Sequence, residues 1–125
     1  MIDRSYTECT SACMQALHAY APGADRVLQA AITTAIARGA TFLLDAQRPD
    51  GSWEGSWGVC FTYGTWFGVC GLASSRDPRA RAAIDRACAF LLAHQQADGG
   101  WGETVESCRA RRYIHAETGQ AVMTS

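Results

Sequence analysis

Two segments of the chain are close copies of each other: Ile36–Trp53 reads IARGATFLLDAQRPDGSW, and Ile84–Trp101 reads IDRACAFLLAHQQADGGW. Every residue of the first segment has its counterpart 48 positions later, and the identical pairs include apolar positions and the final tryptophan. A repeat of this length is typical of stacked supersecondary units. The repeat therefore decides the fold: it predicts two units of similar structure packed side by side.

Each unit begins with the pattern of an amphipathic helix. Apolar residues recur at helical steps at Val27, Ile32, Ile36, Ala40, Leu43 and Leu44 in the first unit and at Ala83, Ala87, Phe90, Leu91 and Leu92 in the second. Each helix is expected to end at a polar turn, Pro49-Asp50-Gly51 or Gly99-Gly100, because glycine accepts the positive φ that such turns need.

Two further helices flank these segments. Residues Glu8 to about Tyr20 read as a helix with Thr7 as a possible N-cap. The stretch Trp57–Ala73 is apolar on most sides, which predicts a helix buried all round. It contains four glycines (Gly58, Gly64, Gly68 and Gly71), which let a neighbouring helix or a ligand approach closely. The order predicts an all-α fold in two concentric layers, with the most apolar helices inside.

The composition of the chain excludes several classes of function. The chain has 125 residues, about half of them apolar, and a net charge of −1, which argues against a nucleic-acid partner. We see no signal peptide and no apolar run of the ~20 residues that span a bilayer. The six cysteines lack the C-x-x-C spacing, and most lie among apolar residues, so we expect them to be reduced. Cys9, Cys13 and His18 offer half of a metal site, but this spacing is common by chance, and we predict no metal.

The turn of each unit carries the pattern Gln-x3-Gly-x-Trp. It comprises Gln47, Gly51 and Trp53 in the first unit, and Gln95, Gly99 and Trp101 in the second. This pattern resembles the QW motif of triterpene cyclases and related prenyltransferase-like proteins. The motif is structural: the glutamine can bond free backbone groups at the helix end, and the tryptophan can cover the turn while its N–H finds an acceptor.

Three other segments resemble the oxidosqualene cyclases, the lanosterol-forming members in particular. They are Gly51–Phe67 (GSWEGSWGVCFTYGTWF), Tyr6–Ala12 (YTECTSA), and Glu106-Ser107-Cys108 followed by Arg111-Arg112-Tyr113. The resemblance implies a partial (α/α) barrel over residues 1–116, with a divergent tail at 117–125. It also implies an enzyme that cyclises 2,3-oxidosqualene to a sterol-type alcohol without a cofactor, and membrane association through other segments, at the endoplasmic reticulum or lipid droplets in a eukaryote or at the cytoplasmic membrane in a bacterium.

The resemblance implies roles for three residues. Cys9 matches a cysteine that hydrogen-bonds the catalytic aspartate, and Trp57 matches an aromatic residue that lines the cavity and attracts carbocations through its π face. Tyr63 follows Trp57 by six residues, so helical spacing would place it near the same face as a supporting group. Without the resemblance, Trp57 would read as an ordinary core residue.

The sequence also departs from the family. The Asp-Cys-Thr-Ala motif that carries the catalytic acid is absent, and the family pattern is lost after His115. We therefore expect a fragment of a cyclase that needs the missing remainder and is inactive alone. The alternative is a non-catalytic α/α-repeat module that binds an isoprenoid or a protein partner.

Overall fold

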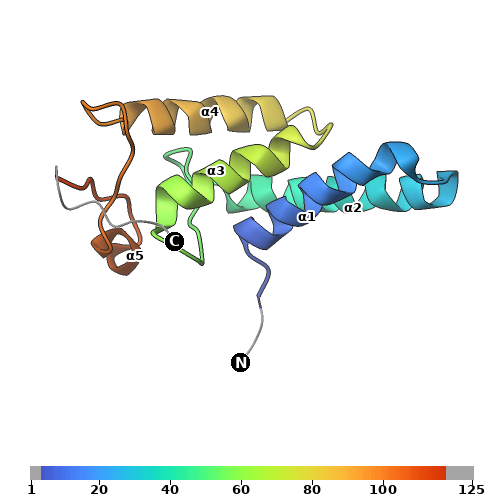
Figure 1. Ribbon diagram of the computed structural model, residues 1–125, viewed down its shortest axis with the longest axis horizontal. Helices are drawn as coiled ribbons and strands as arrows, with labels where there is room; N and C mark the ends of the chain where they lie inside the picture. The colour runs from blue at the N-terminus through green and yellow to red at the C-terminus, as the bar shows by residue number, and fades with distance from the viewer. Residues whose placement is uncertain (1–3, 118–125) are drawn as a thin grey trace.

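The computed structural model describes residues 4–117, and within them it is built of helices joined by loops (Figure 1). The elements are α1 (Thr7–Tyr20), the short 3-10 helix η1 (Ala21–Gly23), α2 (Arg26–Ala46), α3 (Cys60–Ala73), α4 (Ala80–Ala93) and α5 (Glu106–Ala110). One isolated antiparallel bridge joins Glu103 and His115. The all-α prediction is confirmed. Apart from Glu117, the segment predicted to be a divergent tail lies outside the described residues.

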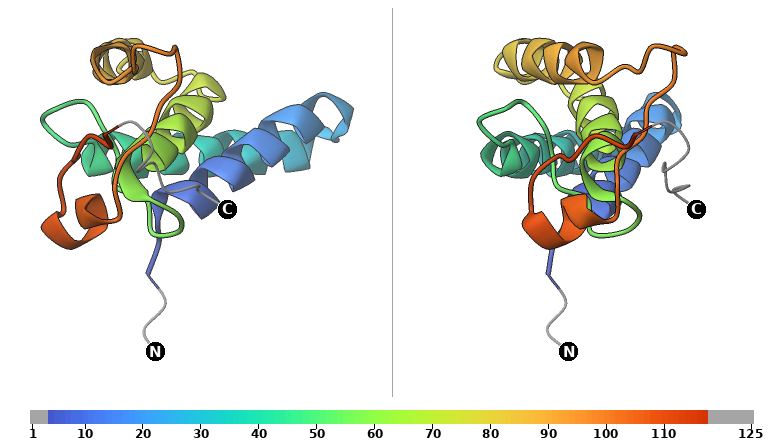
Figure 2. Two further views of the ribbon diagram at one scale, coloured as in Figure 1. Left: turned by 60° about the vertical axis from the view of Figure 1, so that its left-hand side comes forward. Right: turned by 90° about the vertical axis from the view of Figure 1, so that its left-hand side faces the viewer.

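Helix α3 lies at the centre of the arrangement. It contacts α1, α2, α4 and α5, and it crosses between α4 on one side and the α1–α2 pair on the other (Figures 1 and 2). The first unit contributes α2 and the second contributes α4, and these two helices also touch each other. The repeated segments therefore pack side by side, and the most apolar helix of the chain joins them.

Two predicted helix starts are wrong. Helix α1 begins at Thr7 itself, and its N-cap is Tyr6, whose side chain makes no capping bond. Helix α3 begins at Cys60 rather than Trp57. Residues 56–59 form a bend in which Gly58 has a φ of +77°, a value that interrupts a helix and suits glycine.

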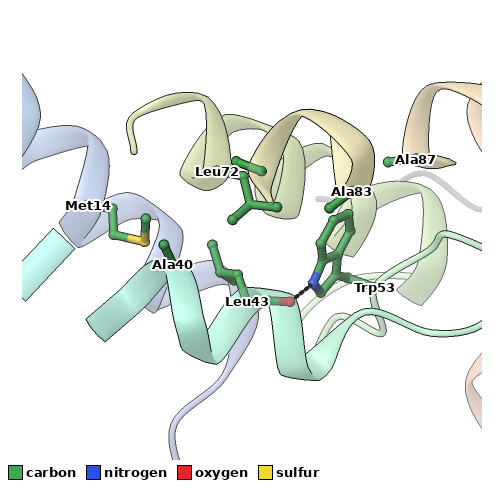
Figure 3. Packing of buried hydrophobic residues seen from close by; sticks show 8 residues of the cluster. Met14, Ala40, Leu43, Trp53, Leu72, Ala83 and Ala87 are labelled. Atoms are coloured by element: carbon green, nitrogen blue, oxygen red, sulfur yellow. Dashed lines mark hydrogen bonds between the residues drawn. The ribbon is translucent and has the colours of Figure 1, made fainter. Parts of the chain in front are cut away.

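The main core is small, and Trp53 lies within it beside Ala83 (Figure 3). Its buried members are Met14, Ala40, Leu43, Trp53, Leu72, Ala80, Ala83 and Ala87. Ala83 and Ala87 on α4 leave room for the large indole of Trp53, whereas Ala40 on α2 lies beside Met14 (Figure 3). The Trp53 Nε1–H donates to the carbonyl oxygen of Leu43 at 2.7 Å, so the buried indole keeps its hydrogen bond.

Glycines on α3 allow this packing. A Cβ added to Gly68 would collide with the Trp53 ring, and one added to Gly71 would lie 2.6 Å from Leu43 Cδ1. The predicted close approach is confirmed on this face. The opposite face is open, since Trp66 is 55% exposed. The expectation that this helix is buried all round is therefore wrong, because the described residues cover one side of it only.

The two QW motifs form the same pair of hydrogen bonds. Each glutamine Nε2–H donates to the carbonyl oxygen of its glycine, at 3.0 Å for Gln47 and 2.8 Å for Gln95. Each tryptophan Nε1–H donates to the carbonyl of the leucine ten residues earlier, at 2.7 Å for Trp53 and 2.8 Å for Trp101. Both motif glycines have a positive φ, +89° and +88°. In both units the motif glutamine and tryptophan therefore bond backbone carbonyls around the turn.

The two motifs differ in what surrounds them. Gln47 also donates to the Ala83 carbonyl on α4 at 2.8 Å, so the first motif is bonded to the next unit. Gln95 has no such second acceptor among residues 4–117. Trp53 is fully buried, whereas Trp101 is 45% exposed. The first motif therefore joins two units, and the second closes only its own turn.

Two cysteines contradict the expectation of reduced thiols. Cys60 and Cys108 form a disulfide between the start of α3 and α5, with a Cα–Cα distance of 5.7 Å. Each follows the tryptophan of its QW motif by seven residues, so the bond joins equivalent positions of the two units. The other cysteines are free, and Cys9, Cys13 and Cys88 are exposed rather than buried. The apolar neighbours in the sequence did not indicate burial, because they lie on other faces of the helices.

One helix meets the length and composition that a membrane span requires, contrary to the expectation of none. This helix is α2, with 21 residues. The indication is weak, because core helices of soluble proteins pass the same test and α2 packs against α1, α3 and α4.

The burial of the two motif tryptophans predicts unequal effects of the same substitution. Trp53→Phe should lower the free energy of unfolding by about 2–3 kcal/mol, because it leaves a cavity and an unbonded buried carbonyl. Trp101→Phe should cost under about 1 kcal/mol, since its site is partly open to water. Urea unfolding followed by circular dichroism measures both values. Equal losses would contradict the assignment of Trp53 as the residue that joins the units.

The disulfide predicts that four of the six cysteines react with an alkylating agent in the unfolded, unreduced chain. Replacing both Cys60 and Cys108 with Ser should lower the free energy of unfolding by about 2–4 kcal/mol, because the bond closes a long loop. The matched control replaces Cys9 and Cys13 with Ser and should change stability little. Mass spectrometry counts the alkylated thiols, and six in the wild-type chain would refute the bond.

Candidate active site

The segment between the first QW motif and α3, residues 55–59, carries Trp57 and turns tightly. The Gly55 N–H donates to the Cys60 carbonyl at 3.0 Å, which closes the turn. The positive φ of Gly58 reverses the chain, and a Cβ at this position would lie 3.3 Å from the Tyr63 ring. The loop is therefore folded back on the start of α3, and Trp57 projects from it with 65% of its surface exposed.

A buried carboxylate from α1 holds this loop. Glu8 is 5% exposed, and its Oε1 accepts hydrogen bonds from the backbone N–H groups of Ser56 at 2.6 Å and Trp57 at 2.8 Å. The other oxygen, Oε2, is also buried and has no hydrogen-bond partner within residues 4–117. Short bonds from N–H groups to a carboxylate are among the stronger hydrogen bonds in proteins. The loop is thus fixed to a helix 48 residues earlier in the chain.

A second buried carboxylate caps α3. Glu103 is 3% exposed, and its Oε1 accepts from the N–H groups of Phe61 at 2.8 Å and Thr62 at 2.7 Å. These N–H groups belong to the first turn of the helix, where no intrahelical acceptor exists and negative charge is favoured. Burial, together with the Glu103 charge, raises the pKa of the neighbouring Tyr113. The start of α3 is therefore held by Glu103 while the loop before it is held by Glu8.

A partly exposed network of ion pairs covers the outer side of the same region. Glu54 pairs with Arg48 at 3.1 Å and with Arg111 at 3.0 Å, and this pairing raises the pKa of Arg111. Arg48 also donates to the Arg111 carbonyl at 2.7 Å and lies over the Phe61 ring, 5.0 Å from its centroid. Arg111, whose side chain is 74% exposed, thus connects the end of α5 to Arg48 and Glu54.

The structure places the three predicted site residues in different surroundings. Cys9 is exposed on α1. It directly follows Glu8, the residue that accepts a hydrogen bond from the Trp57 backbone N–H. Tyr63 is half-buried on α3, edge-on to Phe67 with ring centroids 5.0 Å apart. The expectation that Tyr63 shares a helix face with Trp57 is wrong, because Trp57 precedes the helix. Tyr63 instead packs against the Gly58 bend behind the loop.

The described structure has two hollows that are lined by residues other than the three predicted site residues. One, of about 680 Å³, is bordered by Arg48, Glu54, Arg111 and the Cys60–Cys108 pair. The other, of about 540 Å³, lies between the end of α1, α2 and the α3–α4 loop. Neither is lined by Cys9, Trp57 or Tyr63. Within residues 4–117 no cluster of three or more His, Cys, Asp or Glu side chains is arranged to hold a metal ion.

Sequence reasoning missed the two buried carboxylates. A glutamate in the first turn of a helix, as Glu8 is, reads as an ordinary helix-favouring charge. Glu103 reads as part of a loop. Their partners lie 48 and 41 residues away, and no spacing rule connects positions so distant. The disulfide did leave a signal, because Cys60 and Cys108 differ by the repeat period itself.

Comparison with known proteins assigns the family. The profile of the squalene-hopene cyclase C-terminal domain matches residues 1–125, the whole chain. The chain belongs to this family. Its all-α structure is consistent with this family, and the resemblance noted in the sequence is confirmed.

Relatives with assigned names point to oxidosqualene cyclases within the family. The chain is 52% identical over 124 residues to lanosterol synthase from Homo sapiens, covering 96% of this chain and 17% of that protein. It is 50% identical over 127 residues to cycloartenol synthase from Dictyostelium discoideum, covering 99% and 18%, respectively. It is 48% identical over 128 residues to lanosterol synthase from Mus musculus, covering 99% and 18%. The chain thus spans about a sixth of the length of these relatives.

The cap on α3 predicts a stability loss at Glu103. Glu103→Ala should lower the free energy of unfolding by about 1–3 kcal/mol, because two buried N–H groups lose their acceptor. The matched control is Glu106→Ala on α5, whose carboxylate is exposed and pairs with Arg109, and it should cost under about 0.5 kcal/mol. Thermal unfolding followed by circular dichroism compares the two, and similar losses would argue against the cap.

Proposed function

We propose that this squalene-hopene cyclase C-terminal domain is part of an oxidosqualene cyclase, which converts 2,3-oxidosqualene to a sterol-type triterpene alcohol such as lanosterol. The observation that carries the proposal is the match of nearly the whole chain to named lanosterol and cycloartenol synthases at about half identity. The exposed indole of Trp57, on a loop fixed from two sides, supports it.

Trp57 is proposed to stabilise carbocations. Cyclisation of an epoxide through carbocations needs negative potential near the cation but no base that would remove a proton early. An indole face provides this, by ~2 kcal/mol or more in a dry cavity. Tyr63, behind the Gly58 bend, is proposed to support the loop from α3 and to add an aromatic edge beside Phe67.

Cys9 is proposed to hydrogen-bond the catalytic aspartate. A thiol that donates to one carboxyl oxygen orients the acid and stabilises the carboxylate left after proton transfer, which makes the acid a better proton donor. No Asp-Cys-Thr-Ala motif occurs in the sequence, so this acid and the facing walls of the cavity would come from the remainder of the cyclase. We infer that the 125-residue chain alone does not turn over oxidosqualene, and that the full enzyme associates with a membrane through other segments.

A hybrid enzyme tests the function. The matching segment of human lanosterol synthase is replaced by this chain, and conversion of 2,3-oxidosqualene by the purified hybrid is measured by gas chromatography with mass spectrometry. We expect a cyclic triterpene alcohol as product. In the hybrid, Trp57→Leu should lower kcat by about 30-fold, equivalent to ~2 kcal/mol, and Trp57→Phe by less. Cys9→Ala should lower kcat by roughly 10- to 100-fold.

The control for Cys9 is Cys88→Ser, an exposed free cysteine on α4, which should leave the rate unchanged. A folded hybrid that binds substrate but forms no cyclic product would reject the proposed function in favour of a non-catalytic repeat module. Normal rates for both the Cys9 and Trp57 variants would reject their assigned roles while leaving the function in place.

A further inference from the structure

No hydrogen bond or ring contact holds the Trp57 indole in the described structure. Within residues 4–117 it takes part in no hydrogen bond and no ring contact, and 65% of the residue is exposed. Its direction therefore depends on the backbone of the loop that carries it. That backbone is fixed at two points by the bonds that Ser56 and Trp57 donate to Glu8.

We propose that Glu8 is a positioning residue, which aims the Trp57 indole through the Ser56 and Trp57 backbone N–H groups. The inference rests on the proposed function of Trp57 as a cation-binding aromatic. Two consecutive N–H groups bonded to one oxygen fix the orientation of the peptide plane between them and of the plane before it. These planes place the backbone nitrogen and Cα of Trp57, and thus the point from which its side chain leaves the loop.

The loop is built closely around this carboxylate. A Cβ added to Gly55 would lie 3.1 Å from Glu8 Oε1 and 2.9 Å from the Cys60 carbonyl oxygen, so there is little room for the loop to shift toward α1. On the other side, the Tyr63 ring lies against Gly58. The loop is thus confined between a charged acceptor on α1 and an aromatic ring on α3.

The carboxylate serves the two loop N–H groups at a cost to its own hydrogen bonding. Burying a charge is costly, and Glu8 Oε2 gains no hydrogen bond within the described residues. A shape-matched apolar side chain would avoid that cost but would leave the two N–H groups without an acceptor. The arrangement makes sense if the position of the loop matters to the protein.

Two adjacent residues of α1 then have different roles. Glu8 holds the loop of Trp57, and the adjacent Cys9 carries the thiol proposed to meet the catalytic acid. The helix itself is fixed to α3, because the Ser11 hydroxyl donates to the Phe67 carbonyl at 2.6 Å. One rigid element therefore sets the relative position of the acid partner and the cation-binding aromatic, and Glu8 is the link between them.

The test uses fluorine NMR of the 125-residue chain labelled with 5-fluorotryptophan, in which Trp57→Phe identifies the Trp57 resonance. Glu8→Gln keeps an acceptor oxygen in place without the charge, whereas Glu8→Asp keeps the charge but withdraws the oxygen by one methylene. We expect Glu8→Gln to retain the wild-type Trp57 resonance. In Glu8→Asp this resonance should move toward its position in the urea-unfolded chain, and the Ser56 and Trp57 amides should exchange at least tenfold faster, while the Trp53 resonance stays unchanged.

The matched control is Glu103→Asp, which shortens the other buried carboxylate and should alter the Phe61 and Thr62 amides without moving the Trp57 resonance. A Trp57 resonance that stays in place in Glu8→Asp, or that is lost in Glu8→Gln, overturns the proposal. Movement of Trp53 together with Trp57 also overturns it, because it would show a general structural role. No turnover is measured, so failure here leaves the proposed function standing, and failure of the hybrid enzyme leaves this result intact.

Discussion

The indole of Trp53 is the contact on which the rest of the structure depends. It fills the space between three helices, and its N–H satisfies the Leu43 carbonyl at the end of α2, where the helix has run out of donors of its own. Because the ring lies flat against Gly68, α3 can pack closely beside the first unit. The Gln47 side chain then joins the same turn to α4, because its amide N–H donates a hydrogen bond to the Ala83 carbonyl. A single turn thus positions α2, α3 and α4 together.

This packing leaves α3 with two different faces. The face of α3 that carries Gly68 and Gly71 packs against Trp53 and Leu43. The aromatic residues Tyr63, Trp66 and Phe67 pack against one another away from the main core. The loop before α3 emerges beside this aromatic face and presents Trp57. The same close approach that builds the core therefore determines where the exposed aromatic surface lies. Trp57 and Tyr63, the two residues proposed to serve the carbocation, lie on this side of α3.

How much the sequence could predict depends on the range of each interaction. The QW turns were predictable because their bonds close within ten residues and recur in both units. The central place of α3 followed from its apolar composition. The start of α3 was not predictable, since the bend at Gly58 is stabilised from Tyr63 and Glu8. The carboxylates Glu8 and Glu103 were not predictable either, because each meets its partners across more than forty residues. The disulfide joins two cysteines one repeat period apart, but the apolar residues around Cys60 led to the prediction of a reduced thiol.

The exposure of Trp57 and the burial of Glu8 follow from one constraint. Backbone N–H groups in a bend cannot bond within a helix, and those near the start of α3 have no internal acceptor. Holding the loop outward requires an acceptor brought from another element, and a carboxylate serves two N–H groups with one oxygen. The charge buried at Glu8 is therefore the consequence of keeping an aromatic face exposed at a fixed position.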